Sequence, residues 1–372
     1  MNLRVRGLPL STLPRLVAAR RPPRLSPERP RHVFLALCDH WEPMWGNPPR
    51  HVQHERVERW VRDYLPSVAG LADSRGQAPQ HTFFYPAEEY EPAFLDRLAE
   101  LCRQGAGQVE VHLHHDGDTS DRLRAKLERF TRQLADEHGL LERDSQGRVR
   151  YGFIHGNWAL DNSRPDGRWC GVNDELTILR ETGCYADFTM PSAPDPCQTR
   201  TINSIYYAVD DPLRPCSHDR GTRARVGAEP PADSLLLIQG PLACDWGRRK
   251  WGLVPRLENG DLQGHHPPTL ERLDLWCRAS VVVEGRPEWL FVKLHTHGAQ
   301  EENAAMLLGP AMRRFHESLA QRAARDPLLR YYYVTARELA ALVHQAEAGR
   351  IEPCFEEPAL NPAGPQSAQA AP

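Results

Sequence analysis

Hydrophobic residues occur along this chain in short continuous runs and in longer runs with helical spacing. A short continuous apolar run is typical of a strand buried on both faces of a parallel sheet. The runs that predict strands are 32–38, 81–85, 108–114, 150–155, 188–190, 235–239, 289–295 and 331–334. Between them, apolar residues recur every three or four positions, which predicts helices with one buried face. The helical segments are 50–65, 94–102, 119–134, 173–182, 270–279 and 335–348, with a proline-interrupted helix from 303.

Strands that alternate with helices imply a parallel sheet, which can be doubly wound or closed as a barrel. Two local signals support the helix boundaries. Gly183 follows one helix in the position of a C-terminal cap, and Thr335 with Glu338 forms a capping-box pattern at the start of the last helix. Turn residues dominate 210–268 around a single clear strand, so we interpret this stretch as an elaborated insertion.

The two ends of the chain differ in composition from its centre. Residues 1–31 are rich in Arg and Pro, and residues 353–372 form a low-complexity tail. Neither segment has the apolar content to bury a core. We therefore expect a basic, disordered arm at 1–31, a disordered tail at 353–372 and one folded α/β domain at 32–352.

The overall composition narrows the class of protein. The 372 residues include 46 Lys and Arg against 49 Asp and Glu, for a net charge of −3, with 40% hydrophobic residues and a mean hydropathy of −0.58. These values are typical of a soluble globular protein and exclude a collagen-like or membrane-spanning chain. The near-neutral total argues against a nucleic-acid binder. Because the arm is basic, its peripheral contact with an anionic membrane surface is a hypothesis.

The cysteines and the N-terminal residues bear on the compartment. Nine cysteines are scattered between Cys38 and Cys354 without a CxxC pair, which argues against a disulfide scaffold and against a zinc ribbon. Near the N-terminus, Arg4, Arg6 and Pro9 interrupt the apolar residues, so the pattern of a signal peptide is missing. We expect reduced thiols and a cytoplasmic protein.

Histidine and acidic residues gather where the predicted strands end. In parallel α/β folds the carboxyl ends of the strands carry the active site. The polar residues at four such ends are Asp39, His40 and Glu42; His112, His114, His115, Asp116 and Asp118; His155, Asn157 and Asp161; and His295 and His297. A divalent metal takes imidazole and carboxylate ligands from several segments, so this constellation predicts a metal site. A histidine that packs in the core is the alternative for any one of them.

Five segments, in order along the chain, carry a resemblance to a known family. They are LALCDHWEP, HTFFYPAEEY, GQVEVHLHHDGDT, NDELTILRETGCYADFTMPS and WLFVKLHTHG, which together span about residues 32–300. This set resembles the polysaccharide deacetylase superfamily of carbohydrate esterases. The resemblance implies a distorted (β/α) barrel of about seven parallel strands, enlarged by the insertion at 210–268.

The resemblance also implies roles for individual residues. The family's first aspartate, its general base, corresponds to Asp39, and its second, a metal ligand, corresponds to His40. The two histidines of the metal motif correspond to His114 and Asp118. The late-strand histidine, which acts as general acid, corresponds to His295. His and Asp are thus exchanged at two of three metal positions, and one carboxylate and two imidazoles remain.

The implied cofactor is a divalent metal, with Zn²⁺ as the expected ion, and the implied reaction is hydrolysis of an acetamide or ester on carbohydrate. His112, His115 and Glu42 are alternative ligands if the register differs. The family's arginine–proline motif is absent near HGNWALDNS. Aromatic residues can stack on sugars. The residues expected to contact substrate are Trp41, Glu42, Asn157, Trp158 and His297.

Three functions therefore remain open. The first is a metal-dependent carbohydrate deacetylase. The second is a glycoside hydrolase that pairs Asp39 or Glu42 with Asp161 or Asp118. The third is a catalytically silent carbohydrate-binding protein on the same scaffold. Fold alone does not choose among them.

Overall fold

The computed structural model describes residues 4–5, 8–9, 12, 16 and 28–355. Most of the predicted arm and most of the predicted tail therefore lie outside the described residues, and their disorder stays a prediction. Two short strands of the arm, β1 (Arg4–Val5) and β2 (Leu8–Pro9), pair as an antiparallel ladder. The Leu8 side chain is buried in a small cluster with Leu242.

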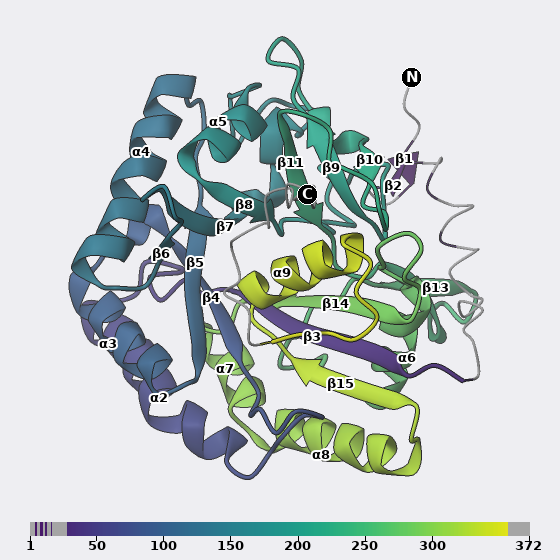
Figure 1. The fold of residues 1–372 in the computed structure, drawn as a ribbon. Helices are drawn as coiled ribbons and strands as arrows, with labels where there is room; N and C mark the ends of the chain where they lie inside the picture. The colour runs from purple at the N-terminus through teal and green to yellow at the C-terminus, as the bar shows by residue number, and fades with distance from the viewer. Residues whose placement is uncertain (1–3, 6–7, 10–11, 13–15, 17–27, 356–372) are drawn as a thin grey trace, which may run out of the picture.

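Eleven strands form one sheet in which most neighbouring strands are parallel (Figure 1). Along the sheet lie β10 (Thr222–Arg223), β9 (Ile205–Val209), β11 (Ser234–Ile238), β8 (Cys184–Asp187), β7 (Val149–His155), β5 (Gly107–Leu113), β4 (His81–Pro86), β3 (Arg31–His40) and β14 (Trp289–Thr296), with β15 (Leu329–Tyr333) beside β3 and β6 (Glu142–Arg143) beside β7. Among the described residues of this sheet, only β9 with its two neighbours and β6 with β7 pair antiparallel. The predicted α/β class is confirmed. No regular ladder joins β10 to β14 in the described part of the chain, so a closed barrel stays a prediction.

Helices cover both faces of this sheet. One core cluster joins the sheet to α2 (Arg50–Val68), α3 (Pro92–Arg103), α4 (Ser120–Arg132), α5 (Glu175–Thr182), α6 (Leu270–Ala279), α7 (Glu301–Leu307) and α8 (Pro310–Arg325). On the other face, α9 (Ala336–Glu347) packs Leu339 and Val343 with Phe34 and Phe291. Figure 1 shows α9 in front of β3 and β14. Within residues 28–355, no helix is both long and apolar enough to cross a membrane.

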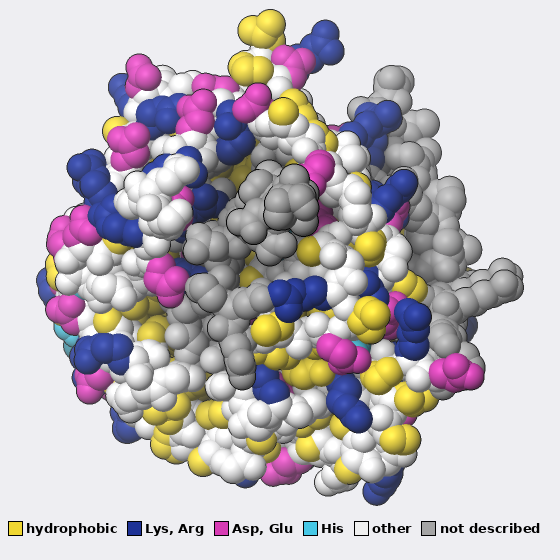
Figure 2. Space-filling view, in the orientation of Figure 1, with side chains coloured by type: hydrophobic (Ala, Val, Ile, Leu, Met, Phe, Trp, Pro, Cys, Tyr) yellow, Lys and Arg dark blue, Asp and Glu magenta, His cyan; other side chains and the backbone are white. Residues whose placement is uncertain are grey.

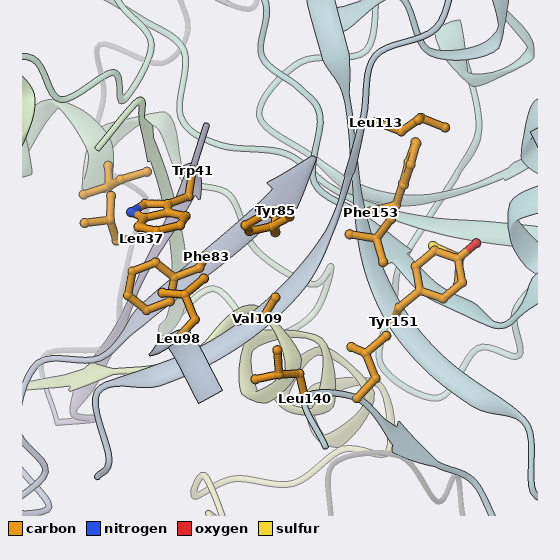
Figure 3. Packing of buried hydrophobic residues seen from close by; sticks show 14 of the residues in the cluster. Leu37, Trp41, Phe83, Tyr85, Leu98, Val109, Leu113, Leu140, Tyr151 and Phe153 are labelled. Carbon is orange, nitrogen blue, oxygen red and sulfur yellow. The ribbon is translucent and has the colours of Figure 1, made fainter. Parts of the chain in front are cut away.

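Strand β3 divides its side chains between the two cores, because successive residues of a strand point to opposite faces. Val33, Leu35 and Leu37 belong to the core beside α2 and α3, where Figure 3 shows Leu37 next to Phe83 and Trp41. Their alternates along the strand belong to the core beneath α9; they are Phe34, Ala36 and Cys38. The same alternation sends Asp39 and His40, at the end of the strand, in opposite directions.

Two differences from the predicted elements concern the second half of the sheet. The strand predicted at 188–190 lies instead at Cys184–Asp187, directly after Gly183, whose φ of 107° ends α5. Strand β9 was not predicted, although its sequence IYYAV is a continuous apolar run. The insertion contains β11 as predicted and also a separate hairpin of β12 (Ala243–Lys250) and β13 (Val254–Glu258).

The packing of α8 on β15 gives a prediction about pH. His316 is buried and its Nδ1 lies 2.8 Å from the Tyr333 hydroxyl. Burial, reinforced by Arg313, lowers the pKa of His316 from 6.5 to about 4. The unfolded chain therefore binds a proton at His316 below pH 6.5, whereas the folded chain binds it only below about pH 4. The free energy of unfolding consequently falls as pH falls through this window. We expect His316 to cost about 2 kcal/mol at pH 5 relative to neutral pH.

Urea unfolding at several pH values measures this effect. His316→Asn should remove most of the stability loss between neutral pH and pH 5, while His51→Asn, at an exposed position of α2, should leave the wild-type slope. Equal slopes for His316→Asn and wild type would contradict the assignment.

Candidate metal centre

The carboxyl ends of β3, β5 and β14 bring four of the predicted histidines together. The ring of His40 lies 4.8 Å from that of His112 and 4.8 Å from that of His297, between centroids. The His295 ring is 6.2 Å from that of His40. In the sheet, β4 lies between β5 and β3, and β14 lies on the other side of β3. Because parallel strands place their carboxyl ends at one edge, residues from distant parts of the sequence meet there.

Glu42 lies at the centre of these imidazoles. Its Oε1 is 3.3 Å from Nε2 of His112 and 3.2 Å from Nε2 of His114. Its Oε2 is 3.2 Å from Nδ1 of His297. One carboxylate therefore faces three imidazoles, and a fourth, that of His40, packs beside them.

The hydrogen bonds around this group indicate that a cation fits it. His112 donates through Nδ1 to the Ile154 carbonyl at 2.8 Å, so in the neutral imidazole Nε2 carries a lone pair directed at Glu42. The lone pair on Nε2 and the Glu42 carboxylate repel each other, and a cation or a proton between the two atoms removes this repulsion. In addition, His40 Nε2 and His295 Nδ1 are buried without a hydrogen-bond partner among the described residues. Buried nitrogens without partners are costly, unless a ligand uses their lone pairs.

The donor chemistry agrees with this geometry. Ligand atoms of His40, Glu42 and His112 all lie within 4.8 Å of one another, and all three side chains are buried. Two imidazoles and one carboxylate form a ligand set found in catalytic zinc sites that keep a fourth position open. We call His40, Glu42 and His112 the central group. These residues fit a divalent metal of the zinc type.

Electrostatics within the central group follow from burial and the crowding of imidazoles. Burial opposes the charged form of Glu42, but the facing His112, His114 and His297 outweigh it and hold the pKa of the carboxyl well below its usual value. Burial, with His112 and His297 nearby, holds the pKa of His40 well below 6.5. The carboxylate is therefore charged and the His40 imidazole neutral at pH 7, as metal ligands must be.

The central group is accessible from one side. His114 and His297 have side chains that are 32% and 24% exposed, whereas His40 is 3% exposed. His114 also hydrogen-bonds through Nδ1 to Glu88, a residue of the short helix η2 (Ala87–Glu89). Burial opposes protonation of His114, but Glu42 and Glu88 outweigh it and raise its pKa to about 10. His114 and His297 thus form the solvent-facing rim of the site.

A loop after β7 supplies another part of the surroundings. Trp158 is partly buried, and its ring lies 6.4 Å from that of His40. Asn157 and Trp158 belong to η4 (Gly156–Trp158) and have φ values of 55° and 57°, in the left-handed region. Such backbone is uncommon outside glycine and is held only where the surrounding structure fixes it.

Three residues of the predicted site lie elsewhere. Asp39 points to the opposite face of β3, where its oxygens accept from the Gly298 amide at 2.6 Å and contact His81 Nε2 at 2.8 Å. Trp41 is fully buried against Phe83. The predicted role of Asp39 as general base and that of Trp41 in substrate contact stay predictions that this placement does not favour.

Asp118 is the third of these residues. Its Oδ2 lies 2.6 Å from Lys126 Nζ and 3.4 Å from His115 Nδ1, so it belongs with His115 behind β5 and not with the central group. Conversely, the predicted site omitted Glu88, which contacts His114. The two glutamates in HTFFYPAEEY follow a strand end and were the available signal.

Comparisons with known proteins add little to this picture. No family model matches the chain, and no curated protein is similar to it. Among solved structures, the chain is similar to a "putative polysaccharide deacetylase from Mycobacterium smegmatis", with 13% identity and a TM-score of 0.42, over 88% of this chain and 95% of that one. Similarity at this level establishes neither the family nor the activity of the chain.

Proposed function

We propose that this chain is a metal-dependent hydrolase that removes acetyl groups from N- or O-acetylated carbohydrate. The observation that carries the proposal is the central group of His40, Glu42 and His112, whose ligand atoms lie within 4.8 Å of one another below a rim that is open to solvent. The choice of substrate rests on the resemblance of the five ordered sequence segments to polysaccharide deacetylases.

His40, Glu42 and His112 would hold the ion, which is Zn²⁺ in this proposal. A divalent ion at this position supplies Lewis-acid polarisation of an acyl carbonyl and activation of water. The protein orients one of these ligands through a contact outside the central group. His112 is fixed by its bond to the Ile154 carbonyl, and such outer contacts set the tautomer and the direction of the ligand nitrogen.

The rim residues are suited to moving protons. His114 lies between the carboxylates of Glu42 and Glu88 and is partly exposed, so it can hold a proton and pass it to a leaving sugar amine or alcohol. A cation on Glu42 would weaken the attraction between that carboxylate and the proton on His114. The resemblance gives the role of acid to His295, but this residue is buried. Burial, and to a lesser extent the charge of Lys293, hold the pKa of His295 well below 6.5. We therefore favour His114 as the proton donor.

Trp158, whose ring lies 6.4 Å from that of His40, and the preceding Asn157 are the residues that we propose for sugar binding. The carboxylates required by a glycosidase are less well placed. Asp161 is buried and accepts from the Ser217 amide at 2.5 Å, whereas Asp118 is paired with Lys126. We therefore keep the deacetylase as the single proposed function.

Metal analysis and product analysis test the proposal together. Purified protein should contain zinc, and a chelator should lower acetate release from N-acetylated chito-oligosaccharide by at least about 10²-fold, with recovery when Zn²⁺ is returned. The same samples should release no new reducing ends. Full activity in metal-free protein would overturn the metal requirement. Reducing ends without acetate would indicate a glycosidase, and binding without turnover would indicate a silent member of the fold.

A further inference from the structure

A second group of metal-ligating side chains lies outside the central group. His115 follows β5, His155 ends β7, Cys170 lies in the loop after η5 (Leu160–Asn162), and Glu175 begins α5. One ligand atom from each lies within 4.8 Å of all the others. His155, Cys170 and Glu175 are fully buried and His115 is 6% exposed. We call these four residues the buried cluster.

Glu175 connects the members of the buried cluster. Its Oε1 lies 3.2 Å from Nε2 of His115 and 3.6 Å from Nε2 of His155. Its Oε2 lies 3.4 Å from Sγ of Cys170 and also accepts from the Asp161 amide at 2.6 Å. Two imidazoles and a thiol therefore converge on one carboxylate in a space that solvent does not reach.

His155 has an orientation that a hydrogen-bond network alone does not explain. Its Nδ1 bonds to the Gly156 carbonyl, which can only accept, so Nδ1 carries the proton. In the neutral imidazole, the lone pair on Nε2 then faces the Glu175 carboxylate. This Nε2 is buried and has no hydrogen-bond partner in the part of the chain that the structure describes. Two acceptors that face each other in a dry site need a positive charge between them.

The surroundings of Cys170 and His115 resemble the outer contacts of a metal ligand. Backbone amides of Asn162 and Val172 donate to Sγ of Cys170 at 3.3 and 3.4 Å. Such bonds stabilise a thiolate more than a thiol, because a charged acceptor binds a donor more strongly. His115 Nδ1 lies 3.4 Å from Asp118, which leaves its Nε2 directed into the cluster. Carboxylate and backbone partners of this kind orient metal-bound histidines and tune ligand basicity.

We propose that His115, His155, Cys170 and Glu175 bind a structural divalent cation of the zinc class. Two imidazoles, one thiolate and one carboxylate suit a borderline-soft ion, and four protein ligands close the tetrahedral shell. The thiolate and the carboxylate together neutralise a divalent charge, which makes the loaded cluster neutral and compatible with burial. Because the four residues are shielded from solvent, the site has no position for a substrate.

The cation would fasten the loop 156–174 to the ends of β5 and β7. This loop holds five non-glycine residues with positive φ: Asn157, Trp158, Asp161, Asn162 and Trp169. Left-handed backbone at such residues costs free energy and persists only where other contacts fix it. Since Trp158 lies beside His40, the structural ion would position one wall of the central group.

Cobalt substitution tests the site directly, because a thiolate ligand gives Co²⁺ an intense near-ultraviolet charge-transfer absorption. Wild-type protein refilled with Co²⁺ should show this band and bind about two equivalents of metal. Cys170→Ser should lose the band and about one equivalent. Cys184→Ala, which removes another buried cysteine, should retain both. Glu42→Gln should lose one equivalent and keep the band, so failure of the central group and failure of the buried cluster are distinguishable.

Proteolysis gives a second readout, since Arg168 lies in the loop with its side chain 58% exposed. Removing metal from the wild type, or the change Cys170→Ser, should speed trypsin cleavage after Arg168 by about tenfold or more.

Absence of the charge-transfer band in the wild type would overturn the proposal, whether or not Cys170→Ser folds. Equal metal content in Cys170→Ser and Cys184→Ala would overturn it too and would leave a proton as the positive charge in the cluster.

Discussion

Glu42→Gln is expected to lower acetate release by about 10³-fold and to remove the metal of the central group. Glu42 faces His112, His114 and His297 within 3.3 Å. A neutral amide cannot balance a divalent cation, and its NH₂ group would donate to Nε2 of His112 and so occupy the lone pair that the cation needs. Metal content and the rate of acetate release, measured on the same preparation, check this prediction.

The control for this variant is Glu55→Gln, which removes the same charge from an exposed position of α2, where the side chain is 68% exposed. It should keep both metal and activity. Thermal unfolding of the two variants distinguishes loss of the metal site from loss of the folded structure. Wild-type metal content and turnover in Glu42→Gln would contradict the central group as the catalytic centre.

Asp39→Asn is expected to act on stability more than on chemistry. The Asp39 carboxylate is fully buried and accepts from the Gly298 amide while it contacts His81. These contacts tie β3 to the turn after β14 and to the start of β4. A neutral amide weakens both of them, so we expect a loss of about 3 kcal/mol in the free energy of unfolding.

Urea unfolding measures that loss, and Asp63→Asn in α2, where the side chain is 39% exposed, is the control. Acetate release per folded molecule should change by less than about tenfold, because Asp39 points away from the central group. Loss of a general base would instead cost about 10²–10⁴-fold. A fall of that larger size, with unchanged stability, would instead support the role that the family resemblance gives to Asp39.

The buried strands were the part of the fold that sequence predicted best. The runs 32–38, 108–114 and 289–295 correspond to β3, β5 and β14, because strands covered on both faces need nearly continuous apolar sequence. The strand at 188–190 was wrong by about one strand length. There, the apolar run continues past Asp187, although β8 ends at that residue. Where the chain leaves the sheet depends on its tertiary contacts, which a local sequence pattern does not show.

The meeting of the histidines was predictable from one rule, that parallel strands place their carboxyl ends at one edge. That rule gave His40, His112, His114, His115, His295 and His297 as neighbours. It was wrong for His115, which lies with Asp118 and Glu175 instead. It did not say which of two adjacent residues faces the site. Asp39 and His40 must diverge on a strand, but only the packing of α2 against one face and α9 against the other decides which is turned towards the centre.

The sequence by itself determined the α/β class, the strand ends that carry the chemistry, and the excess of imidazole over carboxylate there. These properties are local, since periodicity and residue type can be read along the chain. Only the tertiary structure decided that Glu42 sits among three imidazoles, that Asp118 turns away to Lys126, and that Cys170 meets His115, His155 and Glu175. These contacts join residues up to 255 positions apart, as in the pair Glu42 and His297. Their geometry depends on loop paths that no periodic pattern encodes.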